Sequence, residues 1–266
     1  MIVLAPATRR HRLLLGALVL IWAVSWPVIK VGIATVPPLW FGCLRYVVAT
    51  ICLFAFVVAR GDLALPSRSD MRLVAVSGAL QMGAFSALTG LALTIVPPGR
   101  ASVLAFSTPL WVVPLAAWAI SIVVVRGHRF DASPLTLAPW QMLVAAALLC
   151  PLAIIVEGRP HAIGARGIAS LAYVGPMATA FTYWAVVEVG RAFRAATISM
   201  ALLATPGLGL LISALTLHEI VTTPLAAGII LVAAGIRLAV IDAPRIPSRV
   251  APSQRSAARS PGGRLG

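Results

Sequence analysis

Residues 38–59 read PLWFGCLRYVVATICLFAFVVA, and only one of them, Arg45, carries a charge. A helix of this length rises about 33 Å at about 1.5 Å per residue, which is enough to cross the hydrocarbon core of a bilayer. Strands of a membrane barrel would instead alternate apolar and polar side chains over shorter segments. The stretch therefore predicts a helix that spans a membrane.

Seven further apolar runs of similar length accompany this one. Together they predict an all-α polytopic bundle of about eight transmembrane helices, at residues 13–33, 38–59, 73–95, 101–125, 135–156, 167–187, 195–217 and 222–241. Of all residues 60% are hydrophobic and 11% are charged, and the mean hydropathy of +0.99 is too high for a soluble domain. The first run lacks a small-residue cleavage site, so we interpret it as a retained span rather than a signal peptide.

The basic residues are distributed unevenly along the chain, whose formal net charge is +14. With the N-terminus in the cytoplasm, sixteen arginines fall in cytoplasmic segments and three, Arg100, Arg159 and Arg166, fall on the other side. This asymmetry predicts a multi-pass protein of the plasma membrane with both termini cytoplasmic. We therefore interpret the charge as a topology signal and expect no nucleic-acid partner. Residues 1–12 and 242–266 are predicted to be a cytoplasmic N-terminus and a disordered cytoplasmic tail.

The three cysteines, Cys43, Cys52 and Cys150, all lie inside apolar runs. Their odd number and apolar surroundings predict small core residues without a disulfide or metal role. No paired His, Asp or Glu ligands fall on one face of an expected helix, so we expect no metal and no cofactor.

The chain also matches itself at a shift of 96 or 97 residues. Residues 22–25 (WAVS) align with 118–121 (WAIS), Arg45 aligns with Gln141, residues 84–85 align with 180–181, and residues 108–109 align with 205–206. The paired spans are an odd number of helices apart, so the two copies run in opposite directions through the membrane. Inverted repeats of this kind are typical of secondary transporters, whose substrate sites lie between the copies.

Several of these motifs resemble the EamA family of the drug/metabolite transporter superfamily. The resemblance rests on WAVSW at 22–26 with Lys30, FGCLRY at 41–46, TPLW at 108–111, PWQML at 139–143, TP at 205–206 and HE at 218–219. It implies ten helices in two inverted units, whereas this chain lacks about two helices of length. The run at 101–125 matches the seventh span in its first half and the first span in its second half. We therefore expect a truncated first repeat at 13–117 fused to a second repeat at 118–241.

Polar side chains inside the spans are the candidates for a substrate pathway. Arg45 lies about 10 Å below the start of its span, where a charge is costly unless it faces a cavity or carbonyl partners. Lys30 is closer to a span end, where snorkelling is the alternative. The predicted pathway residues are Trp22, Ser25, Lys30, Arg45, Gln81, Ser107, Thr108, Trp140, Gln141, Tyr183, Trp184 and Thr205. Structural roles in helix packing and interfacial placement are the alternatives for each.

Two prolines, Pro109 and Pro206, occupy equivalent places in the two copies and are predicted hinges. All seven acids fall in loops or at span edges, so no carboxylate stands in mid-membrane to relay a proton or to bind sodium. This pattern favours a facilitator or an exchanger.

The sequence thus predicts alternating-access transport of a small organic metabolite, an amino acid or an amphipathic solute, in the direction of efflux. The expected partners are this solute and the lipid bilayer, and a homodimer is left open. The first alternative is a transport-inactive relative produced by the deletion. A membrane-embedded enzyme is disfavoured, because the four histidines lie in loops or at span ends and no hydrolase or zinc-protease motif occurs.

Overall fold

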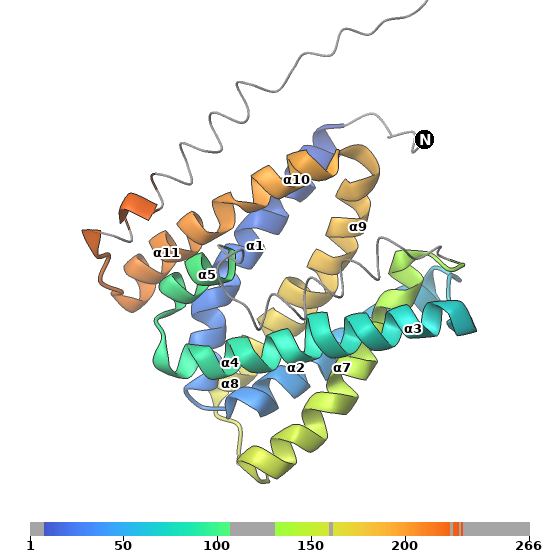
Figure 1. Ribbon diagram of the computed structural model, residues 1–266, viewed down its shortest axis with the longest axis horizontal. Coiled ribbons are helices and arrows are strands. Elements are labelled where there is room, and N and C mark those ends of the chain that lie inside the picture. The colour runs from blue at the N-terminus through green and yellow to red at the C-terminus, as the bar shows by residue number, and fades with distance from the viewer. Residues whose placement is uncertain (1–7, 107–130, 160–161, 224–225, 229, 231–266) are drawn as a thin grey trace, which may run out of the picture.

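The computed structural model describes residues 8–106, 131–159, 162–223, 226–228 and 230, and every regular element in these ranges is a helix. The elements are α1 (Arg9–Ile33), α2 (Pro38–Ala59), α3 (Arg68–Val76), η1 (Ser77–Ala84), α4 (Phe85–Ile95), α5 (Pro98–Phe106), α7 (Pro134–Glu157), α8 (Ala165–Tyr173), η3 (Val174–Phe181), α9 (Thr182–Ala192), α10 (Ala195–Leu202) and α11 (Ala204–Leu217). Figure 1 shows them as a bundle of helices that cross one another.

The helices begin and end close to the positions that the apolar runs predict. The span predicted at 38–59 coincides with α2, and the one predicted at 135–156 lies within α7. Five described helices are long and apolar enough to cross a membrane: Arg9–Ile33, Pro38–Ala59, Arg68–Ile95, Pro134–Glu157 and Thr197–Leu217. The chain is therefore an all-α polytopic membrane bundle, as expected.

Three of the eight predicted spans are not among these five. The run at 167–187 forms the continuous helix α8–η3–α9, which is less apolar because it carries residues such as Tyr173, Thr182 and Glu188. Of the run at 101–125, α5 contains the beginning, and residues 107–125 lie outside the described part of the chain. Most of the run at 222–241 also lies outside it.

The third and sixth spans share an unusual internal structure. In each, an α-helix of nine residues leads into a π-helix of eight residues, followed by an α-helix of eleven residues. The three elements of one span have the bounds of the other at a shift of 97 residues. The alignment of residues 84–85 with 180–181 at a shift of 96 is thus displaced by one residue within these spans. Single π-helical segments inside α-helices occur frequently at functional sites.

The core of the bundle lies between α2 and α7, which cross in close contact and belong to different predicted repeats. Buried side chains such as Tyr46, Leu53, Met142 and Leu149 fill this interface. A second core cluster, with Trp26, Phe41 and Val174, joins α1 and α2 to η3.

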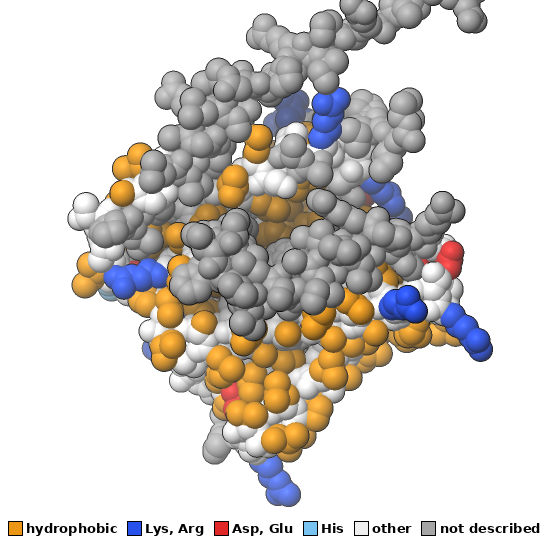
Figure 2. Space-filling model, in the orientation of Figure 1, with side chains coloured by type: hydrophobic (Ala, Val, Ile, Leu, Met, Phe, Trp, Pro, Cys, Tyr) orange, Lys and Arg blue, Asp and Glu red, His pale blue; other side chains and the backbone are white. Residues whose placement is uncertain are grey.

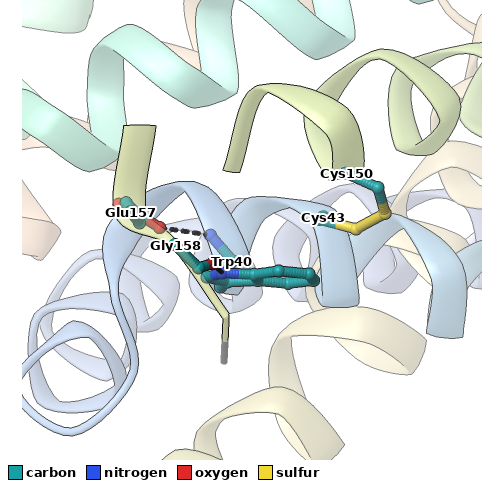
Figure 3. The surroundings of a disulfide bond; sticks show 5 residues. All are labelled: Trp40, Cys43, Cys150, Glu157 and Gly158. Carbon is teal, nitrogen blue, oxygen red and sulfur yellow. Dashed lines mark hydrogen bonds between the residues drawn. A yellow bond between two sulfur atoms is a disulfide. The ribbon is translucent and has the colours of Figure 1, made fainter. Parts of the chain in front are cut away.

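A disulfide bond joins Cys43 of α2 to Cys150 of α7, with the two Cα atoms 5.3 Å apart (Figure 3). The prediction that the cysteines play no disulfide role was therefore wrong for this pair, while Cys52 is free. Apolar runs do not reveal which helices are neighbours, and the close crossing of α2 and α7 is what brings the two thiols within bonding distance.

Candidate functional site

Two glycines let the π-helical segments lie directly against helices of the opposite repeat. A Cβ atom on Gly78 of η1 would lie 2.5 Å from the carbonyl oxygen of Gln141 on α7 and 2.8 Å from Val144. A Cβ atom on Gly175 of η3 would lie 2.6 Å from Val48 on α2 and 3.5 Å from the carbonyl oxygen of Arg45. The two contacts correspond to each other: the glycines are 97 residues apart, and their partners are 96 residues apart. Arg45 and Gln141 thus occupy equivalent places.

Arg45 extends from α2 to the π-helical segment η3. Its Nε donates a hydrogen bond of 2.7 Å to Oγ1 of Thr179, and its guanidinium lies 5.2 Å from the ring centroid of Tyr46. Thr179 is buried, and its hydroxyl donates to the carbonyl oxygen of Val174, five residues earlier. Among the described residues no carboxylate forms an ion pair with Arg45. The contacts that its guanidinium makes among these residues, with Thr179 and Tyr46, are therefore with neutral groups.

Gln141 and Trp22 bind the adjoining turn of α9. The hydroxyl of Tyr183 donates a 2.9 Å hydrogen bond to Oε1 of Gln141, whose side chain is buried. Trp22 of α1 donates from Nε1 to Oγ1 of Thr182 at 3.1 Å and to the carbonyl oxygen of Ala178 at 3.3 Å. Three of the predicted pathway residues therefore contact the helix η3–α9: Trp22, Arg45 and Gln141. A fourth, Tyr183, belongs to that helix. We call these four residues, together with Thr179 and Thr182, the polar layer.

The structure places other predicted residues outside the polar layer. Trp140 lies near the start of α7, where its indole donates to the carbonyl oxygen of Ala64 and packs edge-on against Phe54, so it anchors a loop. Trp184 packs against Phe56 and Phe181.

Of the remaining hydroxyl and amide candidates, two form hydrogen bonds within their own helix and one has a buried hydroxyl. Ser25 donates to the carbonyl oxygen of Trp22 in its own helix, and Gln81 accepts from Ser77 one turn earlier in η1. Thr205 is fully buried, and its hydroxyl has no hydrogen-bond partner among the described residues. Pro206 follows directly, and α10 and α11 are interrupted at Leu203 just before it, which is the position where a proline would break a helix. Ser107, Thr108 and Pro109 lie outside the described residues.

Lys30 is placed at the end of the bundle rather than in the polar layer. Its Nζ donates to the carbonyl oxygens of Leu93 and Thr94, which belong to the last turn of α4. A cation in this position satisfies carbonyl groups that have no partner in their own helix and interacts favourably with the helix dipole.

Two glutamates at span ends cap the starts of other helices, which their position in the sequence did not indicate. Both oxygens of Glu157, at the end of α7, accept hydrogen bonds of 2.9 Å from the backbone N–H groups of Leu39 and Trp40 at the start of α2. Figure 3 shows the bond from Trp40. Glu219, just after α11, accepts in the same way from Gly99 and Arg100 at the start of α5, at 2.8 and 3.1 Å. Each helix start follows the sequence Val-Pro-Pro, at residues 36–38 and 96–98. That repeated sequence is the signal that could have revealed the pair of caps.

The face drawn in Figure 2 is hollowed where Figure 1 places α1 and α9, and the side chains visible on the floor of the hollow are hydrophobic. No group of three or more His, Cys, Asp or Glu residues able to hold a metal occurs in the described ranges. The chemistry that the polar layer offers is one partly buried cation, an amide, hydroxyl groups and an indole. Such a set can bind and orient a small polar solute beside apolar walls.

Comparison with known proteins identifies the kind of protein that has this architecture. The model of the EamA-like transporter family matches the chain twice, at residues 12–118 and 113–241. The uncharacterized transporter YoaV of Bacillus subtilis (strain 168) is 23% identical over 269 residues, which cover 82% of this chain and 92% of the relative. No solved structure matches the chain.

Both similarities are to transporters, and they bear on the length of this chain as well as on its class. The 82% of this chain that aligns with YoaV amounts to about 218 residues, so about 50 of the 269 positions have no counterpart here. This is the length of about two membrane helices. The two family matches overlap at residues 113–118, inside the run in which the sequence predicts a fused helix.

Proposed function

We propose that this chain, which belongs to the EamA-like transporter family, carries a small organic solute across the plasma membrane by alternating access. The solute is an amino acid or another amphipathic molecule, and the direction is efflux. Membership of the family makes the chain a multi-pass membrane transporter. The solute, the direction and the residues of the pathway are our inferences.

The observation that carries the proposal is the placement of Arg45 inside the bundle, bonded to Thr179 of the opposite repeat. A partly buried charge at membrane depth without a carboxylate partner is costly, and in membrane proteins such a charge marks a substrate or ion pathway. The guanidinium has further N–H donors beyond Nε, which suit a carboxylate or another polar acceptor on the solute. Trp22 and Tyr183, which bond to Thr182 and Gln141 in the same polar layer, supply apolar ring surface for the rest of an amphipathic molecule.

The contacts of the polar layer also favour alternating access over a fixed channel. Arg45 and Gln141 reach from α2 and α7 to one helix, η3–α9, through two hydrogen bonds that a solute can replace. The π-helical segments η1 and η3 lie at equivalent positions of the two repeats, so a change in one has a counterpart in the other. We expect these segments to move relative to α2 and α7 during transport.

The acidic residues support a facilitator or an exchanger. Glu157 and Glu219 cap helix starts, and the buried Asp70 accepts from the backbone N–H groups of Asp131 and Ala132 at the start of α7. These carboxylates are engaged at the ends of helices rather than in mid-membrane. Coupling to a proton or sodium gradient would need an acid at membrane depth.

The test is transport in proteoliposomes that contain the full chain. We expect uptake of tritiated leucine or another amphipathic amino acid by wild type, and a loss of at least about tenfold for Arg45→Ala, because removal of a charge-assisted hydrogen bond costs about 1.5–3 kcal/mol. Arg60→Ala is the matched control, since Arg60 lies after α2 and pairs with Asp62 at the surface. Full activity of Arg45→Ala would refute the assignment of the pathway.

A second candidate function follows from the approximately 50 positions of YoaV that have no counterpart in this chain. If the fusion removes helices that the transport cycle needs, the protein is a transport-inactive member of the family. Absence of transport for a panel of amino acids and amphipathic cations, by protein that elutes as a single folded species, would favour this reading.

A further inference from the structure

A cavity with a mainly apolar lining and a few charged groups lies at the end of the bundle, away from the polar layer. Its volume is ≈ 440 Å³, and it is formed where α1 and α4 end, α5 begins and α11 ends. The charged residues in its lining are Lys30, Arg100 and Glu219, and the apolar ones include Ile95, Leu217 and Ile220. The size is within the range of sites for small organic molecules.

The charge of the cavity is unbalanced toward positive. Glu219 uses both carboxylate oxygens to accept from the backbone N–H groups of Gly99 and Arg100, so its charge is engaged with the start of α5. Lys30 and Arg100 carry two positive charges and Glu219 carries one negative charge, so the lining has a net charge of +1. The lining therefore favours an anionic group over a neutral or cationic one.

Hydrogen-bond donors in the cavity lining also remain available. The Nε atom of Arg100 is buried and has no acceptor among the described residues. Lys30 has three N–H donors, and two of them meet the carbonyl oxygens of Leu93 and Thr94. A buried donor without an acceptor is costly, so an anion that accepts from Arg100 and Lys30 would stabilise this arrangement.

We propose that this cavity is a binding site for the carboxylate group of a small organic solute with an aliphatic body. The carboxylate binds Arg100 and Lys30, and the aliphatic part lies against Ile95, Leu217 and Ile220. The inference rests on the proposed transport function and narrows its substrates to solutes that carry a carboxylate. In the topology that we propose, the cavity opens to the outer side of the membrane, where the solute enters or leaves.

The test measures equilibrium binding of tritiated 4-methylpentanoate to the full chain in nanodiscs of phosphatidylcholine. We expect 4-methylpentanoate to bind. Its neutral analogue of the same shape, 4-methylpentanamide, should compete for the site at least about tenfold more weakly than the unlabelled acid, because charge-assisted hydrogen bonds are about twice as strong as neutral ones. Arg100→Gln and Lys30→Gln should each weaken binding by about tenfold or more. Arg166→Gln, which removes an exposed arginine of α8, should leave it unchanged.

Three results would overturn the proposal. The first is equal competition by acid and amide, and the second is binding that neither substitution affects. The third is that phosphatidylglycerol headgroups, but no free carboxylate, stabilise the protein in a way that depends on Arg100. If Arg100→Gln fails to fold, Arg100→Lys keeps the charge and should retain part of the affinity. Leucine transport in the same preparations separates the two proposals. Loss of carboxylate binding with transport intact refutes only the site, whereas carboxylate binding without any transport refutes only the function.

Discussion

Gly78 and Gly175 set the distance between each π-helical segment and the helix of the opposite repeat. At Gly78 the nearest atom to an added Cβ would be a backbone oxygen, at 2.5 Å, which cannot move without the whole of α7. At Gly175 the nearest atoms belong to the side chain of Val48, at 2.6 and 2.8 Å. Rotation of Val48 can move its Cγ1 but not its Cβ, which is fixed to α2, so Gly175 should tolerate alanine only somewhat better than Gly78 does.

We therefore expect Gly78→Ala to destabilise the protein by about 1–3 kcal/mol, through overpacking against α7. Gly175→Ala should cost less than Gly78→Ala. The control is Gly190→Ala in α9, where an added Cβ meets nothing within 4 Å and alanine favours the helix. Thermal unfolding of the three variants in detergent, followed by size-exclusion chromatography, gives the ranking. A Gly78→Ala protein as stable as Gly190→Ala would contradict the close contact.

The residues of the polar layer could be predicted from the sequence only in part. Arg45 and Gln141 were detectable because each is a polar group in a long apolar run and the internal repeat pairs them. Thr179 was not singled out, since a threonine commonly bonds its own helix backbone, and nothing local indicates that Arg45 approaches it across 134 residues of chain. The hydrogen bond of Trp140 to a loop carbonyl was not predicted for a related reason, because the sequence around a tryptophan does not show which distant groups its indole contacts.

At the scale of helices, two helices of the first predicted repeat, α2 and α5, are each capped at their start by a glutamate of the second predicted repeat. The first few N–H groups of any helix lack partners within that helix, and Pro38 at the first position of α2 removes one of them. Glu157 satisfies the next two, those of Leu39 and Trp40. The same carboxylate is favoured by the positive end of the helix dipole.

Glu157→Ala should cost about 0.5–2 kcal/mol, the range for loss of a helix cap. The change should also speed hydrogen exchange of the Leu39 and Trp40 amides without affecting amides in the middle of α2. Glu188→Ala is the comparison, because the ion pair that Glu188 forms in the described part of the chain is with Arg191 of its own helix, at 3.7 Å. Equal protection of the two amides in wild type and Glu157→Ala would show that water or another group satisfies them.

Element boundaries were the most predictable part of the fold, because apolar runs and helix-starting prolines mark them directly. The π-helical segments could not be predicted, since the apolar runs do not show that each segment carries a glycine packed against a helix far away in the sequence. The disulfide was also missed, because pairing depends on which helices cross. Both failures concern contacts between distant parts of the chain, which hydrophobic periodicity does not encode.

For the molecule as a whole, the bond between Cys43 and Cys150 means that the two repeats are covalently joined within their largest contact. Cleavage in the exposed loop at residues 60–67 tests this directly. With a protease site inserted after Leu65, the fragments should migrate together on a non-reducing gel and separate after reduction, in wild type and in Cys52→Ser. In Cys43→Ser they should separate under both conditions. Separation of the wild-type fragments without reductant would show that the bond is absent.

This covalent link constrains the proposed transport cycle. If the repeats moved apart between α2 and α7, the bond would block transport and only the reduced protein would work. The buried side chains and the Glu157 cap that surround the bond instead favour an α2–α7 unit that stays together. We therefore expect transport in proteoliposomes to be unchanged, within about twofold, between oxidised wild type and Cys43→Ser, while Arg45→Ala is inactive in both forms. Motion would then be confined to η1, η3 and their flanking helices, where the hydrogen bonds of the polar layer can break and reform.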